Sequence, residues 1–270
     1  MKNAIGIMQG RLSHPSKNGP QVFPTASWRE EFPLARDLGF NQIEWLIEAE
    51  SLLANPLMSD TGRTELKKIE AASGIQVCSA CIHCVLQWKP FAPGGAERIK
   101  PLPAIIAAAA QAGLERLIIP ILEEATIIHA STPAQAAEIF SPALQAAEHA
   151  GMDLAFEMDR PEPECREFIK LLRSPRARLC YDCGNATALG YDIVGEISSM
   201  LPLVGEIHLK DRRVRGPSKP LGEGETRLAE FFSTLKAQAW GGPFILETPV
   251  LSDPTGQARK NLLLVKEFWS

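Results

Sequence analysis

Short apolar runs alternate with longer amphipathic stretches from one end of the chain to the other. Most of the short runs are continuously apolar, which is typical of parallel strands covered by helices. They predict eight strands, at residues 4–9, 42–47, 76–82, 116–122, 153–158, 177–183, 204–210 and 243–248. The stretches between them predict helices at residues 27–38, 60–73, 96–112, 132–150, 162–172, 192–200, 227–239 and 255–268.

Several predicted helices end at a glycine that suits a left-handed cap, namely Gly39, Gly74, Gly113 and Gly151. Eight strand–helix alternations without a break in composition predict an α/β fold, a (β/α)8 barrel that spans residues 1–270 as a single domain. A doubly wound open sheet is the main alternative. No glycine-rich phosphate loop follows the first run, which argues against that alternative.

Composition narrows the class of protein. The chain has 270 residues, is 45% hydrophobic and carries a net charge of −4, so a nucleic-acid or anionic-membrane partner is not expected. Its most apolar segment, residues 102–122, contains Gln111, Glu115 and Arg116, which argues against a membrane span. The start of the chain does not resemble a signal peptide, and the six cysteines are expected to be free thiols, so we expect a cytoplasmic protein.

Four polar residues stand at the ends of the last four predicted strands: Glu157, Asp182, His208 and Glu247. In a (β/α)8 barrel the carboxyl ends of the strands meet on one rim, where catalytic groups lie. Three carboxylates and one imidazole suit a divalent ion that prefers oxygen ligands, with Mn²⁺, Mg²⁺ or Co²⁺ favoured and Zn²⁺ possible. The alternative is that each residue caps the next helix or pairs with an arginine.

Five motifs carry a family resemblance: residues 5–13 (IGIMQGRLS), 39–45 (GFNQIEW), 181–185 (YDCGN), 208–212 (HLKDR) and 221–224 (LGEG). The chain resembles the xylose isomerase-like TIM barrels, in the sugar-phosphate isomerase/epimerase branch that includes ketose 3-epimerases. The resemblance implies that Glu157, Asp182, His208 and Glu247 bind one Mn²⁺-type ion. It also implies that Glu157 and Glu247 transfer protons. Many ketose epimerases have a histidine where this chain has Asn185, so the resemblance does not identify the sugar.

The chemistry also follows from the residue types. Moving a proton beside a carbonyl requires a base over the C–H bond and a Lewis acid at the developing enolate oxygen. A metal ion that holds two adjacent oxygens would stabilise a cis-enediolate. Glu157 and Glu247, on strands separated by two others, could act on opposite faces of the substrate. We therefore predict a metal-dependent sugar or sugar-phosphate epimerase/isomerase and favour epimerisation at C3 of a ketose.

Further residues are candidates for substrate binding. Those near the predicted rim are Gln9, Arg11, Glu44, His83, Asn185, Lys210 and Arg212. Residues 210–219 are rich in lysine and arginine and precede a Gly-Glu-Gly turn, which suits a substrate phosphate. An exposed basic loop is the alternative. The expected partner is a small sugar or sugar phosphate, and assembly into a homo-oligomer is left open.

Three other functions stay open at this stage. A sugar or inosose dehydratase would use the same metal site. A DNA-repair endonuclease-like metal hydrolase of the same superfamily holds several zinc ions with many histidines, and the five histidines and acidic balance of this chain argue against it. A metal-free binding protein that keeps the barrel is the third, and stoichiometric bound metal would exclude it.

Overall fold

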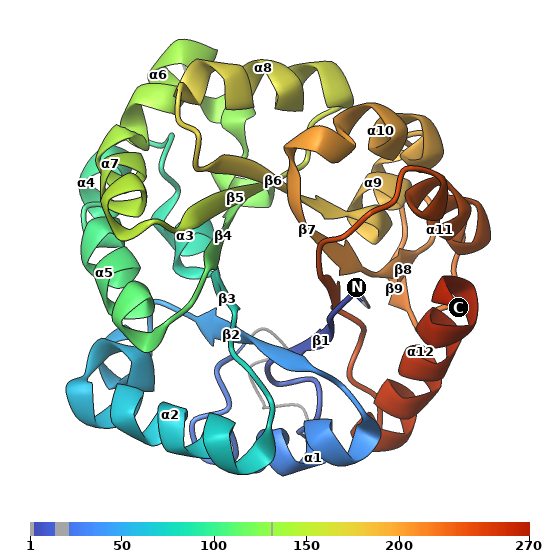
Figure 1. The fold of residues 1–270 in the computed structure, drawn as a ribbon. Helices are drawn as coiled ribbons and strands as arrows, with labels where there is room; N and C mark the ends of the chain where they lie inside the picture. Colours follow the sequence, from blue (N-terminus) through green and yellow to red (C-terminus); the bar gives the residue numbers. More distant parts are fainter. Residues whose placement is uncertain (1–2, 14–21, 131) are drawn as a thin grey trace. The chain divides into compact units, whose positions relative to one another are not determined.

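The structure, a computed structural model, describes residues 3–13, 22–130 and 132–270. Eight parallel strands pair in the order β1-β10-β7-β6-β5-β4-β3-β2 and close into a barrel, as the sequence predicts (Figure 1). They are β1 (Ile5–Met8), β2 (Gln42–Ile47), β3 (Ser79–Ile82), β4 (Arg116–Ile121), β5 (Asp153–Met158), β6 (Ala177–Asp182), β7 (Val204–Leu209) and β10 (Phe244–Leu246). Every residue of β1, β2, β3 and β10 is buried, which explains their largely apolar character.

The helices separate these strands along the chain. They are α1 (Glu31–Leu38), α2 (Asp60–Ser73), α3 (Cys84–Trp88), α4 (Gly95–Arg98), α5 (Leu102–Ala112), α6 (Pro133–Ile139), α7 (Ser141–Ala150), α8 (Glu162–Leu172), α9 (Cys183–Leu189), α10 (Ile193–Met200), α11 (Leu228–Ala237) and α12 (Pro254–Trp269). Short 3-10 turns lie at Leu52–Ala54, Pro56–Met58, Glu123–Ala125, Ile127–His129 and Leu201–Leu203. A two-stranded antiparallel ribbon, β8 (Asp211–Arg212) with β9 (Ser218–Lys219), follows β7.

Two predicted helices are each divided in the structure. The helix expected at 132–150 is α6 and α7, which meet at Phe140. Pro142 in the first turn of α7 cannot donate a backbone hydrogen bond to the preceding turn, so the helix restarts there. The helix expected at 96–112 is likewise α4 and α5, with Pro101 at the start of α5. Short helices α3 and α9 were not predicted.

Glycine caps end the helices where the sequence places them. Gly39 has φ 90° and donates its N–H to the carbonyls of Ala35 (3.0 Å) and Arg36 (2.9 Å). A side chain at this backbone angle would be strained, so glycine ends α1 at lower cost than other residues. Gly74, Gly113 and Gly151 also have positive φ, which confirms the predicted caps.

The chain forms two compact units. One consists of Met1–Glu44, Ser73–Gln76 and Tyr181–Ser270, and the other of Trp45–Ala72 and Val77–Cys180. In the first, Phe232 packs against Phe231, Phe244 and Trp269 at centroid distances of 6.2, 5.5 and 6.1 Å. In the second, Phe156 packs edge-on against Phe140 and Phe168. That residues 1–270 form one domain stays a prediction.

All six cysteines are free thiols, as expected, and five of them are buried. The helices within the described residues are all too short or too polar to cross a bilayer.

Candidate functional site

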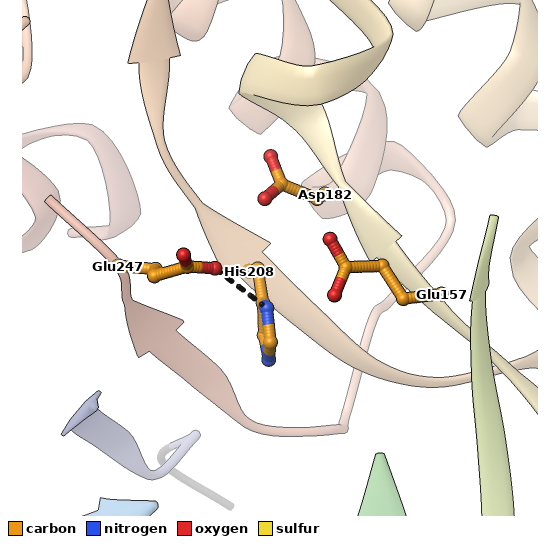
Figure 2. A group of neighbouring side chains, drawn as sticks. All are labelled: Glu157, Asp182, His208 and Glu247. Atoms are coloured by element: carbon orange, nitrogen blue, oxygen red, sulfur yellow. Dashed lines mark ion pairs between the residues drawn. The ribbon is translucent and has the colours of Figure 1, made fainter. Parts of the chain in front are cut away.

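The four polar residues singled out at the strand ends lie together in the structure (Figure 2). Glu157 is in β5, Asp182 ends β6, His208 is in β7 and Glu247 directly follows β10. One ligand atom from each lies within 4.8 Å of the others, and all four residues are buried. Three carboxylates and an imidazole at this spacing fit a divalent ion. The role of each residue stays a prediction.

The imidazole of His208 lies between two carboxylates. Its Nδ1 is 3.2 Å from Oε2 of Glu247, and its Nε2 is 3.2 Å from Oε1 of Glu44. The side chains of His208 and Glu44 are fully buried. The two ring nitrogens therefore face different parts of the site, one toward a candidate ligand and one away from the cluster.

Two cations approach the carboxylate of Glu247. Nζ of Lys210 lies 2.9 Å from its Oε1, and a guanidinium nitrogen of Arg11 lies 3.6 Å from the same oxygen. Burial by itself raises the pKa of Glu247, but Lys210, His208 and Arg11 together hold that pKa well below its usual range. Glu247 is therefore ionised at neutral pH. Lys210 also lies 2.8 Å from Oδ2 of Asp182, so it bridges two of the candidate ligands.

The Asp-Cys-Gly-Asn segment at the end of β6 has a local explanation. Asp182 caps α9, because its Oδ1 accepts the backbone N–H of Asn185 at 2.8 Å. A Cβ at Gly184 would lie 2.7 Å from Cβ of Lys210, so only glycine lets the two segments come this close. The thiol of Cys183 donates to the carbonyls of His208 (3.4 Å) and Lys210 (3.3 Å), and burial raises its pKa. This thiol is therefore a structural group.

Glu206 is a buried carboxylate that the sequence analysis missed. Its Oε1 lies 3.7 Å from Nε2 of His208, and its side chain has no exposed surface. The pKa of Glu44 is raised to about 8, mainly by burial; the neighbouring Glu206 also raises it, and the imidazole of His208 opposes the rise. Glu206 and His208 are two residues apart in one strand, so their side chains point to the same face. The two-residue spacing of Glu206 and His208 within one predicted strand is the sequence signal that could have identified Glu206.

Hydrogen bonds of its own side chains order the segment that follows β7. The buried carboxylate of Asp211, also missed from the sequence, accepts the N–H groups of Gly222 (2.8 Å), Gly224 (2.9 Å) and Thr226 (3.0 Å). The amides of the Gly-Glu-Gly turn therefore hold Asp211. Arg212 donates to Oδ1 of Asn185 at 2.9 Å and to the carbonyl of Gly216 at 3.0 and 3.2 Å. Asn185 and Arg212 are thus a pair.

The remaining predicted substrate contacts lie near strand ends. Gln9 follows β1, is buried, and donates its N–H to the carbonyl of Glu44 at 2.9 Å. His83 is half-buried at the start of α3. Substrate contact stays a prediction for all seven candidates: Gln9, Arg11, Glu44, His83, Lys210 and the Asn185–Arg212 pair.

Buried Glu31, which the sequence analysis also missed, orders the segment that carries Arg11. Its carboxylate accepts the N–H groups of Gly10 (3.0 and 3.1 Å) and Leu12 (3.3 Å) and the hydroxyl of Ser13 (2.8 Å). No local pattern marked it, since its partners lie about twenty residues earlier in the chain.

Comparison with known proteins agrees with this fold. The family model of the xylose isomerase-like TIM barrel matches residues 32–268. The chain is 25% identical over 247 residues to L-ribulose-5-phosphate 3-epimerase UlaE of Escherichia coli strain K12, covering 86% of this chain and 87% of the relative. Relatives of this kind confirm the resemblance to ketose 3-epimerases.

Two solved structures share the fold. The structure of an L-ribulose 3-epimerase has a TM-score of 0.75 at 18% identity, with 99% of this chain and 95% of that one covered. The structure of an IolI protein with a bound zinc atom also has a TM-score of 0.75, at 14% identity and 99% coverage of both chains.

Proposed function

Because this chain belongs to the xylose isomerase-like TIM barrel family, we propose that it is a metal-dependent 3-epimerase of a ketose or ketose phosphate. The observation that carries the proposal is the buried cluster of Glu157, Asp182, His208 and Glu247, whose ligand atoms lie within 4.8 Å of one another. The named activities of its curated relatives support the same reaction class.

The cluster suits one divalent ion. Three carboxylates and a neutral imidazole favour Mn²⁺, Mg²⁺ or Co²⁺, and Zn²⁺ also accepts such a set. When bound, such an ion would act as a Lewis acid that stabilises negative charge developing on the substrate. Lys210 and Arg11 beside Glu247 add positive charge to the same region.

Proton transfer is assigned to Glu157 and Glu247. Epimerisation removes a proton from one face of a carbon and returns one to the other, so it requires two bases. The low pKa of Glu247 keeps it ionised, which is the form that accepts a proton. Glu157 comes from β5 and Glu247 follows β10, and we assign them to opposite faces of the substrate.

The substrate is proposed as a pentulose or its 5-phosphate, because the relatives act on compounds so named. Within residues 210–219, Arg213 and Arg215 are exposed, and we propose them as the cations that bind a phosphate, because Lys210 and Arg212 are already paired. Asn185 replaces a histidine of many ketose epimerases, so both phosphorylated and free ketoses belong in the assay.

The test is incubation of the protein with Mn²⁺ and L-ribulose or its 5-phosphate in D₂O, followed by NMR of the products. The proposal expects inversion at C3, with deuterium at that carbon in the first-formed epimer. Glu157→Gln and Glu247→Gln should each abolish turnover while circular dichroism stays unchanged. An aldose product without inversion, a dehydrated product, or near-normal turnover in either variant would contradict the two-base epimerase.

A further inference from the structure

Two buried carboxylates, Glu44 and Glu206, lie on the side of His208 away from Glu247, and the proposed reaction uses neither of them. The side chains of Glu44, Glu206 and His208 have no exposed surface. Glu44 is on β2 and His208 on β7, and in the barrel β1 and β10 stand between these two strands. The contact therefore joins strands that are not neighbours, and no backbone pairing enforces it.

Each imidazole nitrogen of His208 lies beside a different carboxylate. Nε2 of His208 lies 3.2 Å from Oε1 of Glu44, a hydrogen-bond distance. A neutral imidazole carries one N–H, so an Nε2 hydrogen that is donated to Glu44 leaves the lone pair on Nδ1. Nδ1 is the nitrogen beside Oε2 of Glu247, at 3.2 Å. This tautomer presents the correct atom to an ion in the cluster.

We propose that Glu44 is a positioning residue that fixes the tautomer and ring orientation of His208, so that Nδ1 faces the ion. Partners of this kind on ligand histidines raise metal affinity by orienting the ring. Glu206, two residues before His208 in the same strand, lies on this side of the ring as well, with its Oε1 3.7 Å from Nε2 of His208. The inference rests on the proposed function, because it takes His208 as a ligand.

A second ion held by Glu44, Glu206 and His208 is the competing interpretation, since their ligand atoms also lie within 4.8 Å of one another. The same imidazole would then bind both ions, the cluster ion through Nδ1 and the second ion through Nε2. That arrangement requires the ring to lose both protons, whereas the positioning role uses the ordinary neutral form. Metal stoichiometry separates the two.

The experiment compares Glu44→Leu with Glu44→Gln. Leucine removes the acceptor at similar volume, and glutamine keeps an oxygen in the same place. Titration of Mn²⁺, followed by calorimetry and by the electron paramagnetic resonance of free Mn²⁺, should give affinity about 10–100-fold weaker for Glu44→Leu and near wild type for Glu44→Gln. Glu70→Leu is the matched control, because Glu70 is also buried but accepts the N–H of Val77 at 2.7 Å. Its Mn²⁺ affinity should not change.

A second readout needs no metal and no activity. NMR of the metal-free protein with ¹⁵N-labelled histidine, assigned through His208→Gln, should show the Nε2–H tautomer in wild type and Glu44→Gln. Glu44→Leu should lose this preference.

The opposite tautomer in wild type, or unchanged Mn²⁺ affinity in Glu44→Leu, overturns the positioning role alone. A second Mn²⁺ equivalent that disappears in Glu44→Leu overturns it in favour of a metal site. Wild type that binds no ion overturns the proposed function as well. The tautomer of His208 in the wild-type protein tests the positioning role of Glu44 even if the Glu44→Leu variant fails to fold.

Discussion

The ammonium nitrogen of Lys210 lies 2.9 Å from Oε1 of Glu247, within a buried group of acidic side chains. Lys210→Met removes this cation and leaves Glu247 and Asp182 buried without it. Breaking a buried ion pair in this way costs about 3–5 kcal/mol, so the metal-free variant should unfold at lower urea. Added Mn²⁺ should restore much of the loss, because an ion in the cluster replaces the missing positive charge.

The control for this measurement is Lys100→Met, which breaks an exposed pair with Glu97. It should change stability by less than about 1 kcal/mol, with or without Mn²⁺. A Lys210→Met variant as stable as wild type would show that the pair does not hold the cluster together.

The pKa of Glu247 predicts how its stabilising effect depends on pH. Its folded pKa lies well below the usual value, so the carboxylate stabilises the metal-free protein above the ordinary glutamate pKa of about 4.3. This contribution is lost as pH falls from there through the folded pKa. Glu247→Gln should therefore be less stable than wild type at pH 7, and the gap should close on acidification. Urea unfolding with a chelator at several pH values measures it, and a gap that widens toward low pH would contradict the assignment.

The raised pKa of Glu44 predicts a pH dependence of stability opposite to that of Glu247. Burial raises its pKa to about 8, so its neutral form stabilises the fold below the ordinary glutamate pKa. This contribution to the free energy of unfolding declines as pH rises, by up to about 1.4 kcal/mol per pH unit, until the pH passes the pKa that Glu44 has in the folded protein. Glu44→Gln stays neutral and should gain stability relative to wild type between pH 5 and 8. A difference that stays constant over this range in metal-free urea unfolding would rule out a neutral Glu44.

Asp211 should control the order of the segment after β7. Its carboxylate accepts three backbone N–H groups, so Asp211→Ala leaves those donors without their acceptor. We expect a loss of about 1–3 kcal/mol and faster hydrogen exchange at Gly222, Gly224 and Thr226. Asp253→Ala removes an exposed cap of α12 and is the control, which should leave those three amides unchanged. Unaltered exchange in Asp211→Ala would exclude this role.

Gly184→Ala tests the close approach of α9 to the segment after β7. The added Cβ would lie 2.7 Å from Cβ and 2.8 Å from the carbonyl carbon of Lys210, so one of these segments must move. We expect a loss of about 1–3 kcal/mol together with weaker Mn²⁺ binding, because Asp182 and Lys210 shift. Gly241→Ala is the matched control, since a Cβ there meets no atom within 4 Å. Equal thermal stability of the two variants would contradict the steric argument.

The sequence by itself determined the strand–helix order and the strand-end placement of the candidate ligands. Apolar runs such as β1 mark buried strands through their own residues, and Gly39 marks a helix end through its own backbone preference. Glu157, Asp182, His208 and Glu247 could be found because parallel strands bring their carboxyl ends to one edge. The same local reasoning missed the break between α6 and α7, although Pro142 signalled it.

Only the tertiary structure decided which charges meet. Glu44 contacts His208 from a strand more than 160 positions away in the chain, and Arg11 and Lys210 reach Glu247 from different strand ends. Such pairs depend on the register of each strand and the closure of the barrel. Sequence periodicity reports which face a side chain occupies, but the partner across the barrel is fixed by contacts distant in sequence.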